Sequence, residues 1–367
     1  MLCSTSYRVS VSHVILHSVR TACCERPREP WRIWRRGTPN RAGLNSILHW
    51  VVTACLGLCS ANCTREAPAL RVGINAWPGY EALYLAQQKG FYRELGVAVR
   101  LVEFSALADA RRAYERGQID VLAASAIEVI QIRDQGVRSP QIVQVVDYSN
   151  GADVILGRAS ITHAELLRGA RIGVELGSLG AYVLARALEK HGLGFSDAKA
   201  LSMDQLSMEA ELGAGHLDAV VTYPPTSIKL QAAAGIHTLF STREIPAEVV
   251  DIIAVEESLL RERPADVVKL LRAFQRAVAY MHAYPKRAYA IMAAREGISP
   301  SDFERAISDG IQLVPGDEQA GFFGPSGKLK RVIEVCSRVL VQTGQIKRGI
   351  EPAAVIAASQ IAAGTLP

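Results

Sequence analysis

The stretch Leu70-Arg-Val-Gly-Ile-Asn-Ala-Trp-Pro-Gly-Tyr-Glu-Ala-Leu-Tyr-Leu-Ala-Gln-Gln-Lys-Gly-Phe-Tyr92 decides the fold that we expect. Apolar residues alternate with others from Leu70 to Ile74, as in a β-strand, and Asn75-Ala-Trp-Pro-Gly79 then breaks the pattern. A helical pattern follows and closes at Gly90, because glycine suits the left-handed turn that ends helices. In an open α/β sheet, a loop of this kind lies at the carboxyl edge of the strands, where ligands bind.

The same succession of strand, loop and helix recurs along the chain. Strands that alternate with helices indicate largely parallel sheets. Besides the strand at 70–74, we expect strands at 97–104, 119–124, 141–149, 153–157, 171–175, 217–222, 236–240 and 249–255. Long apolar stripes at helical spacing predict helices at 264–281, 284–295, 301–307 and 329–343, which we expect to cover the first part of the fold.

Three segments resemble a known family: Val72 to Tyr80, Leu83 to Tyr92, and Gly117-Gln-Ile-Asp-Val121. They look like the opening of the nitrate/sulfonate/taurine-type solute-binding proteins of ABC importers, a family that also contains binders of thiamine-pyrimidine precursors. The resemblance covers roughly residues 70 to 341. It implies a two-lobed α/β fold of the periplasmic-binding-protein type (type II), in which each lobe is a mostly parallel sheet flanked by helices. It also implies a monomer that binds a small-molecule solute and hands it to an ABC permease and ATPase in the inner membrane.

The resemblance suggests how the chain is divided. Residues 1–66 form a leader, 67–153 the first part of lobe I, 154–248 lobe II, 249–345 the return to lobe I with the carboxyl-terminal helices, and 346–367 a tail whose last dozen residues we expect to pack poorly. The lobes would be joined by a hinge of two crossings, near 148–156 and 249–255. Two short echoes, Gly117-x-x-Asp120 and Gly215-x-x-Asp218, are consistent with similar lobes.

Charge is unevenly placed along the chain. The net charge is +5, yet residues 1–66 hold nine arginines against three glutamates, so residues 67–367 carry about −1. Bulk charge therefore gives no support for a nucleic-acid partner. Six of the seven cysteines also precede residue 67, which leaves Cys336 alone in the body and excludes a disulfide or a metal-thiolate cluster there.

The leader predicts export. Basic residues up to Arg41 precede a modest apolar run at 44–61, too short for the ~20 apolar residues of a spanning helix. Val52-Thr-Ala-Cys55 resembles a lipoprotein cleavage box, whereas ordinary cleavage near Ala61 and a disordered basic extension from an upstream start codon are the competing interpretations. The first two imply a periplasmic protein or one that is lipid-anchored at the outer face of the inner membrane.

The sequence contains no complete enzyme motif, so we expect no catalysis, cofactor or metal. The segment Gly321 to Lys328 resembles a P-loop, but its spacing is one residue too long and Leu329 replaces the hydroxyl residue that would bind Mg²⁺. The histidines of the body are scattered without ligand spacing. The related thiamine-pyrimidine synthases carry a cysteine-rich motif that this body lacks. An enzyme acting on a pyrimidine precursor and a sensory ligand-binding module remain the alternatives.

One predicted ligand site is the turn Gly177-Ser-Leu-Gly-Ala181. Ser178 can cap the following helix, so that the amides of Leu179, Gly180 and Ala181 would point at open space with the helix dipole behind them. An anion such as a sulfonate or a carboxylate suits such a turn, and a plain capping turn is the competing interpretation.

Aromatic and acidic residues complete the predicted site. The aromatic residues Trp77, Tyr80 and Tyr223 lie beside prolines and glycines in loops, where large rings are usually partly exposed; they suit a ligand face or packing between loops. Buried carboxylates need partners, so Asp147 and Asp251 would bind an amine or a ring N–H of the ligand, or would pair with arginine or backbone amides at the hinge. An aminosulfonate such as taurine would satisfy both halves of the site. The set of predicted ligand contacts ends with Ser125 and Ser149.

The leader generates a first prediction. Intact-mass analysis of the protein from its native cells should place the mature amino terminus between Cys55 and Leu70, because the basic and apolar segments precede a nearly neutral body. A diacylglyceryl mass on Cys55 would establish the lipoprotein form. A full-length cytosolic species would contradict export.

Overall fold

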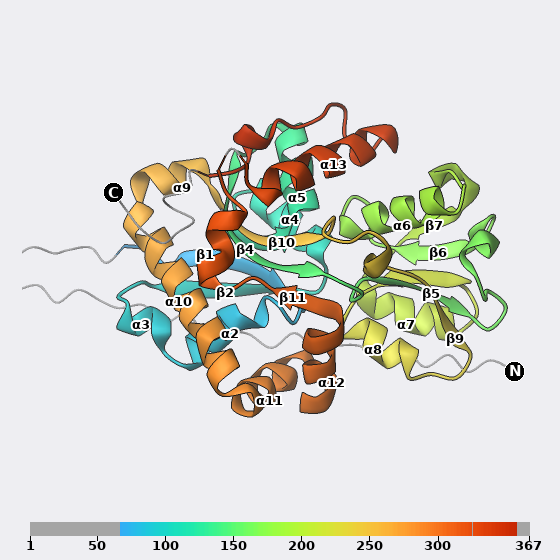
Figure 1. Ribbon diagram of the computed structural model, residues 1–367, viewed down its shortest axis with the longest axis horizontal. Helices are drawn as coiled ribbons and strands as arrows, with labels where there is room; N and C mark the ends of the chain where they lie inside the picture. Colours follow the sequence, from blue (N-terminus) through green and yellow to red (C-terminus); the bar gives the residue numbers. More distant parts are fainter. Residues whose placement is uncertain (1–66, 325, 358–367) are drawn as a thin grey trace, which may run out of the picture. The chain divides into compact units, whose positions relative to one another are not determined.

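In the computed structural model, described here for residues 67–324 and 326–357, the chain builds two β-sheets flanked by helices (Figure 1). We call the six-stranded sheet with its helices the first lobe, and the five-stranded sheet with its helices the second lobe. The predicted export signal, the Cys55 cleavage box and residues 358–367 of the predicted tail lie outside the described residues. Within the described ranges, no helix is both long and apolar enough to cross a bilayer.

The sheet of the first lobe has the order β11-β4-β10-β3-β1-β2. Its strands are β1 (Leu70–Asn75), β2 (Val99–Phe104), β3 (Val121–Ser125), β4 (Pro140–Ser149), β10 (Val250–Glu256) and β11 (Ile311–Leu313). β1 runs parallel to β2 and β3, as expected. β10 is antiparallel to both β3 and β4, because it brings the chain back from the second lobe and enters the sheet from the opposite end. β11 is a short edge strand, antiparallel to β4, that the sequence pattern did not predict.

The sheet of the second lobe repeats this plan in the order β7-β6-β8-β5-β9. Its strands are β5 (Val154–Arg158), β6 (Arg171–Val174), β7 (Lys199–Ser202), β8 (Ala219–Thr222) and β9 (Ile236–Ser241). β6 runs parallel to β7 and β8, whereas β5 is antiparallel to β8 and β9. β7 escaped prediction because it is an edge strand with no fully buried residue, so it lacks the apolar alternation that marks a strand.

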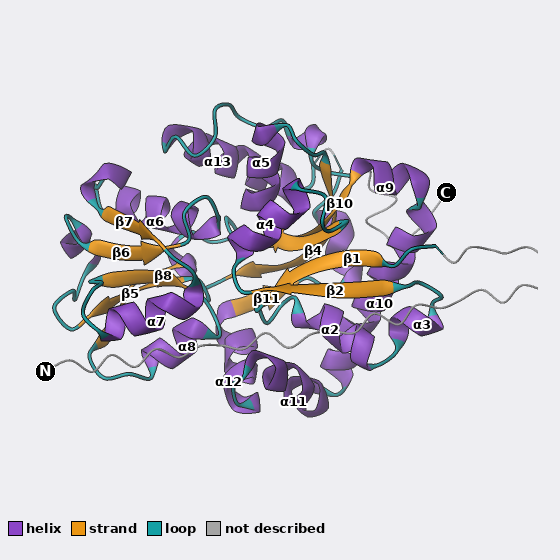
Figure 2. Cartoon of the chain, turned by 180° about the vertical axis from the view of Figure 1, so that it is seen from behind, coloured by secondary structure: helices purple, strands orange, loops and turns teal. Residues whose placement is uncertain are grey.

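Helices cover both faces of both sheets (Figure 2). Those between the strands and after β10 are α2 (Glu81–Gln88), α3 (Phe91–Glu94), α4 (Leu107–Glu115), α5 (Ala126–Gln135), α6 (Leu179–Lys190), α7 (Gln205–Gly213), α8 (Thr226–Gln231), α9 (Glu257–Glu262), α10 (Pro264–Ala283), α11 (Pro285–Glu296), α12 (Pro300–Arg305) and α13 (Lys328–Gln342). α10 and α11 pack on α2 of the first lobe, as expected. α13 packs on α5 and also on α6 of the second lobe, so this helix does not cover the first lobe alone.

The chain passes between the lobes twice. It leaves β4 at Ser149 and enters β5 at Val154, and it returns between Thr242 and the start of β10. The predicted second crossing at 249–255 is therefore wrong by several residues, because almost all of that run is a strand inside the first sheet. Ser149 Oγ and Thr242 Oγ1 lie 2.7 Å apart, and the Gly151 amide donates to the same threonine hydroxyl at 2.7 Å. These bonds fasten the two crossings to each other.

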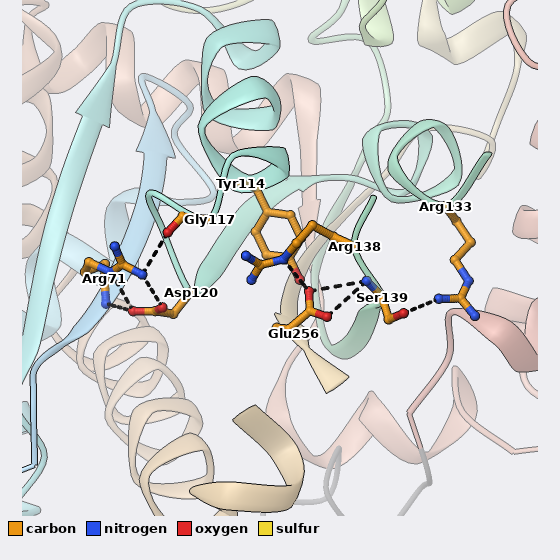
Figure 3. Close-up of polar contacts among 8 residues, drawn as sticks. All are labelled: Arg71, Tyr114, Gly117, Asp120, Arg133, Arg138, Ser139 and Glu256. Carbon is orange, nitrogen blue, oxygen red and sulfur yellow. Dashed lines mark hydrogen bonds and ion pairs between the residues drawn. The ribbon is translucent and has the colours of Figure 1, made fainter. Parts of the chain in front are cut away.

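The two Gly-x-x-Asp echoes form the same structure in each lobe. In the first lobe, the guanidinium of Arg71 donates to the Asp120 carboxylate and to the Gly117 carbonyl, while the Arg71 amide also donates to Asp120 (Figure 3). In the second lobe, Arg171 makes the equivalent bonds to Asp218 and to the Gly215 carbonyl. Each bond set ties the first residues of a central strand to the turn that leads into its neighbour.

The bond set around Asp218 generates a second prediction. Its bond from Arg171 lowers the pKa of this carboxyl to about 2. Asp218→Ala should lower the free energy of unfolding by about 1–3 kcal/mol at pH 7, because the amide and guanidinium of Arg171 lose their acceptor. Urea denaturation would measure the loss.

A matched control removes an exposed carboxylate. Glu257→Ala breaks an exposed ion pair with Arg261 and should cost only about 0–1 kcal/mol. A carboxyl with a depressed pKa stabilises the fold above its unfolded pKa, so the cost of Asp218→Ala should shrink as the pH falls from about 4 toward 2. Equal losses in the two variants at pH 7 would contradict the predicted contribution of this bond set.

Candidate functional site

A small cavity lies where the loops of the two lobes meet, and we call it the central cavity. Its volume is about 10 Å³, which is room for about one water molecule. Residues from both lobes and from the first crossing line it: Asn75, Trp77, Tyr80, Leu107, Asp153, Leu179, Tyr223 and Asp251. Five of them belong to the predicted site, whereas Asn75, Leu107 and Asp153 were not predicted.

Three aromatic rings form the apolar wall of the central cavity. The ring centroids of Trp77 and Tyr80 are 6.4 Å apart, and Tyr223 of the second lobe meets Trp77 edge-on at 6.1 Å. All three side chains are buried, so the expectation of partly exposed rings is wrong. The reason is that the loops of the two lobes cover each other. The rings pack between loops and also line the cavity, so both interpretations of the sequence, a ligand face and packing between loops, describe part of the structure.

Two carboxylates face each other across neighbouring strands at the floor of the site. Asp147 of β4 and Asp251 of β10 are paired in the sheet register. The Trp77 indole N–H donates to Asp147 Oδ2 at 3.2 Å, and the Tyr80 hydroxyl donates to Asp251 Oδ1. The other oxygen of each carboxylate is buried and has no hydrogen-bond partner among the described residues.

Burial controls the protonation of this pair. Loss of solvent raises the pKa of Asp147 to about 7. The pKa of Asp251 is also raised, first by burial and then by the negative charge of Asp147. Among the described residues, no arginine or lysine donates to either carboxyl, so a shared proton keeps the pair from carrying two charges near neutral pH.

Two further acceptors beside the cavity are unfilled. Asp153 Oδ2 and Asn75 Oδ1 are buried, and no described residue donates a hydrogen bond to them. Burial raises the pKa of Asp153 to about 7. The Asn75 amide nitrogen donates across the lobes to the Tyr223 hydroxyl at 3.4 Å. A signal for Asn75 was present in the sequence, since this polar residue closes β1 directly before the loop of Trp77.

The predicted anion site is filled by the protein itself. The Glu128 carboxylate accepts from the Ser178 hydroxyl and from the Leu179 amide, each at 2.8 Å, and so occupies the start of α6. Ser178 does not cap the helix with its side chain, and the Ala181 amide donates to the Ser178 carbonyl. The expectation of free amides at this turn is therefore wrong for Leu179 and Ala181. Gly180 and Ala181 do not line the cavity.

Ser125 acts through the same glutamate. Its amide and hydroxyl donate to the second carboxylate oxygen of Glu128, while its hydroxyl accepts from the Ile127 amide. This is a capping box, and the Ser125-x-x-Glu128 spacing was the sequence signal that could have identified the glutamate. The Ser149 hydroxyl is hydrogen-bonded to Thr242, where the two crossings meet, and Ser149 does not line the cavity.

The surroundings of the cavity are acidic. Glu175 accepts from the Tyr223 hydroxyl at 3.3 Å, and burial raises its pKa to about 7. Among the residues that line the cavity there is no arginine or lysine. Arg111, one turn along α4 from Leu107, is paired with Glu115. Over the described part of the chain, no group of histidine, cysteine and carboxylate side chains has the arrangement of a metal site.

Comparison with known proteins gives the family. Residues 77–288, more than half of the chain, match the family model described as NMT1/THI5 like. The chain belongs to this family. A Haemophilus influenzae protein named for thiamine biosynthesis is 20% identical over 216 residues, which cover 58% of this chain and 68% of that protein.

Solved structures share the fold. The alkanesulfonate-binding protein SsuA of Xanthomonas axonopodis pv. citri, bound to MOPS, superimposes with a TM-score of 0.67 at 19% identity, over 79% of this chain and 98% of that one. The desulfurization enzyme DSZB superimposes with a TM-score of 0.57 at 17% identity, over 81% of this chain and 99% of that one. The two-lobed fold is thus confirmed, and it is a fold on which both binding proteins and an enzyme are built.

The floor of the site generates a third prediction. Gly79 lies so close to Asp147 that a Cβ atom there would be 1.8 Å from Asp147 Oδ2 and 2.9 Å from Trp77 Nε1. Gly79→Ala should lower the free energy of unfolding by about 1–3 kcal/mol, because the buried carboxylate must move and lose its indole donor. Urea denaturation followed by tryptophan fluorescence would show it.

Gly213→Ala is the matched control for this substitution. This glycine is the last residue of α7, and no atom of the described residues lies within 4 Å of its added Cβ. Alanine is the better helix former, so the control should be neutral or stabilising by up to about 1 kcal/mol. An unchanged stability in Gly79→Ala would show that the loop does not hold Asp147 in place.

Proposed function

We propose that the protein is an extracytoplasmic solute-binding protein, which captures a small organic solute by closure of its two lobes and delivers it to an ABC importer. The observation that carries the proposal is the composition of the central cavity, which both lobes and a crossing build together. A solute held there contacts both lobes only when they are closed. The shared fold with alkanesulfonate-binding SsuA supports the same conclusion.

Closure has identifiable contacts. The bonds from Ser178 and Leu179 of the second lobe to Glu128 of the first lobe exist only when the lobes meet, as does the bond between Asn75 and Tyr223. A solute that makes additional contacts in the closed state shifts the population from the open to the closed state. The size of the shift is set by the difference between its affinities for the two states. The closed surface is then the signal for the permease.

The acidic groups bear on the choice of solute. Sulfonate binding finds support in the SsuA fold, but Glu128 fills the turn that we expected to hold the anion. Of the sulfonate- and taurine-like solutes, one that carries an amine therefore fits better. A thiamine-pyrimidine precursor is the second candidate, favoured by the buried acceptors, which suit ring amines, and by the name of the Haemophilus influenzae relative.

Catalysis by a thiol has no group to use at this site. Cys336 is the free cysteine of the described residues, and it is buried against the Tyr182 hydroxyl and the Glu248 carbonyl. Neither Cys336 nor its two partners line the central cavity. Binding and release therefore describe the site better than a reaction does.

A fourth prediction tests the function. Mass spectrometry of the protein from its native cells should detect a copurified small molecule, and small-angle scattering should show a smaller radius of gyration after this molecule is added back to the stripped protein. Tyr223→Ala should weaken binding about tenfold or more, since tenfold corresponds to about 1.4 kcal/mol and the ring covers the cavity.

Ser299→Ala serves as the control, because Ser299 caps α12 at an exposed position away from the cavity. It should leave the affinity unchanged. A protein that carries no solute, together with an unchanged radius of gyration across a panel of small molecules, would contradict the proposal.

A further inference from the structure

We propose that the central cavity binds the solute through a primary ammonium group or an equivalent cation rich in N–H donors. This inference rests on the proposed function and names the chemistry of the ligand at the same site. It follows from three independent features of the cavity: unfilled acceptors, uncompensated acidity and an aromatic wall.

The first feature is the set of acceptors without donors. Buried acceptor atoms that receive no hydrogen bond are rare in folded proteins, because burial removes the bond to water and the loss costs free energy when no other donor replaces it. When the carboxyls are ionised, four such oxygens of the described residues belong to side chains at most 3% exposed, and three of these residues line the cavity. The atoms are Asn75 Oδ1, Asp147 Oδ1, Asp153 Oδ2 and Asp251 Oδ2. A ligand that presents several N–H groups in one place fills this need, and an acceptor-only group such as a sulfonate does not.

The second feature is charge. Asp147, Asp153 and Asp251 are buried together, and Glu128 and Glu175 lie behind them. The residues that line the cavity include no basic side chain. A cationic head group supplies the missing positive charge in a desolvated site, where Coulomb attraction is strong, whereas an anion would be repelled by the buried carboxylates.

The third feature is the shape and chemistry of the wall. The rings of Trp77, Tyr80 and Tyr223 surround a space of about 10 Å³. Aromatic faces attract cations through the ring quadrupole. The space suits an –NH₃⁺ group and is too small for a trimethylammonium group, which also lacks the N–H donors that the acceptors need. The body of the solute then sets how far the lobes part.

In the protein without ligand, protons bound to the buried carboxyls neutralise the charge that a cationic ligand would neutralise. Burial raises the pKa values of Asp147 and Asp153 to about 7, and the pKa of Asp251 is raised as well. Glu175 behaves likewise, and the remaining neighbour, Glu128, is held by donors from Ser125, Ser178 and Leu179. A cation must displace a proton, so its affinity should rise with pH.

The sign of the effect on stability is opposite. A carboxyl whose folded pKa lies above its unfolded value stabilises the fold below the unfolded pKa, and this contribution is lost as the pH rises through the folded pKa. The empty protein should therefore lose stability between about pH 4 and 8 at these groups. A bound cation should restore it at the upper end of that range.

The experiment uses three small probes with different head groups. Thermal shift of the stripped protein at pH 8 is measured with 100 mM methylammonium, tetramethylammonium or methanesulfonate, at equal ionic strength. Methylammonium should raise Tm above the other two. Its affinity should fall about tenfold from pH 8 to pH 6, as expected for displacement of one proton from a group with a pKa of about 7.

Variants locate the effect. Asp251→Asn keeps the size of the side chain but removes the charge, and it should abolish the preference for methylammonium over tetramethylammonium. Asp317→Asn removes one charge from an exposed position and should keep that preference. The pH dependence of the wild-type protein needs no variant, so it decides the question if Asp251→Asn fails to fold.

The outcomes separate this inference from the proposed function. Equal shifts with methylammonium and tetramethylammonium, no shift with methylammonium, or stabilisation by methanesulfonate would overturn the cation site. A copurified solute without a basic nitrogen that still contracts the protein would also overturn the cation site and leave the binding function standing. A protein that carries no solute and keeps its radius of gyration, but is stabilised more by methylammonium than by tetramethylammonium, would overturn the binding function and leave the cation site standing.

Discussion

The buried pair Asp147 and Asp251 is the constraint on which the rest of the site depends. Two carboxylates side by side in a protein interior are costly, and they persist only when neighbours donate hydrogens or a proton is shared. Trp77 and Tyr80 supply one donor each, and Gly79 leaves the room that Asp147 needs. The loop after β1 is thus shaped around the acidic pair.

The pair also explains why the strand order matters. β10 returns from the second lobe and inserts between β3 and β4, and this insertion brings Asp251 beside Asp147. The floor of the site is therefore made by a strand that has just left one crossing, and Asp153 in the other crossing lies at the same cavity. Under the proposed closure, a movement of the lobes about the crossings would change the surroundings of these carboxylates and so would couple closure to their protonation.

Glu128 gives the closed state its own internal bonds. Its carboxylate takes the place of an anion at the start of α6, where the helix dipole and the Leu179 amide favour negative charge. The lobes can consequently meet without an anionic ligand. The turn at Gly177–Ala181, which resembles an anion site in sequence, serves here as a contact between lobes.

The sequence by itself determined most strands and the long helices, because each has a local period of apolar residues. The two-lobed α/β plan followed from the resemblance of residues 70–341 to a known family. The sequence also predicted Trp77, Tyr80, Leu179, Tyr223 and Asp251, which stand in loops or strands of recognisable type and which the fold brings to one cavity. Other features were set by the tertiary structure alone.

The edge strands β7 and β11, the course of the return crossing and the contact of α13 with α6 depend on partners far away in the chain. Asn75, Leu107 and Asp153 line the cavity for the same reason. Whether the amides at the start of α6 are free depends on Glu128, fifty-one residues before Leu179, and no local pattern could show that its carboxylate lies there. Local periodicity fixes which residues form an element, whereas long-range packing decides which polar atoms are left for a ligand.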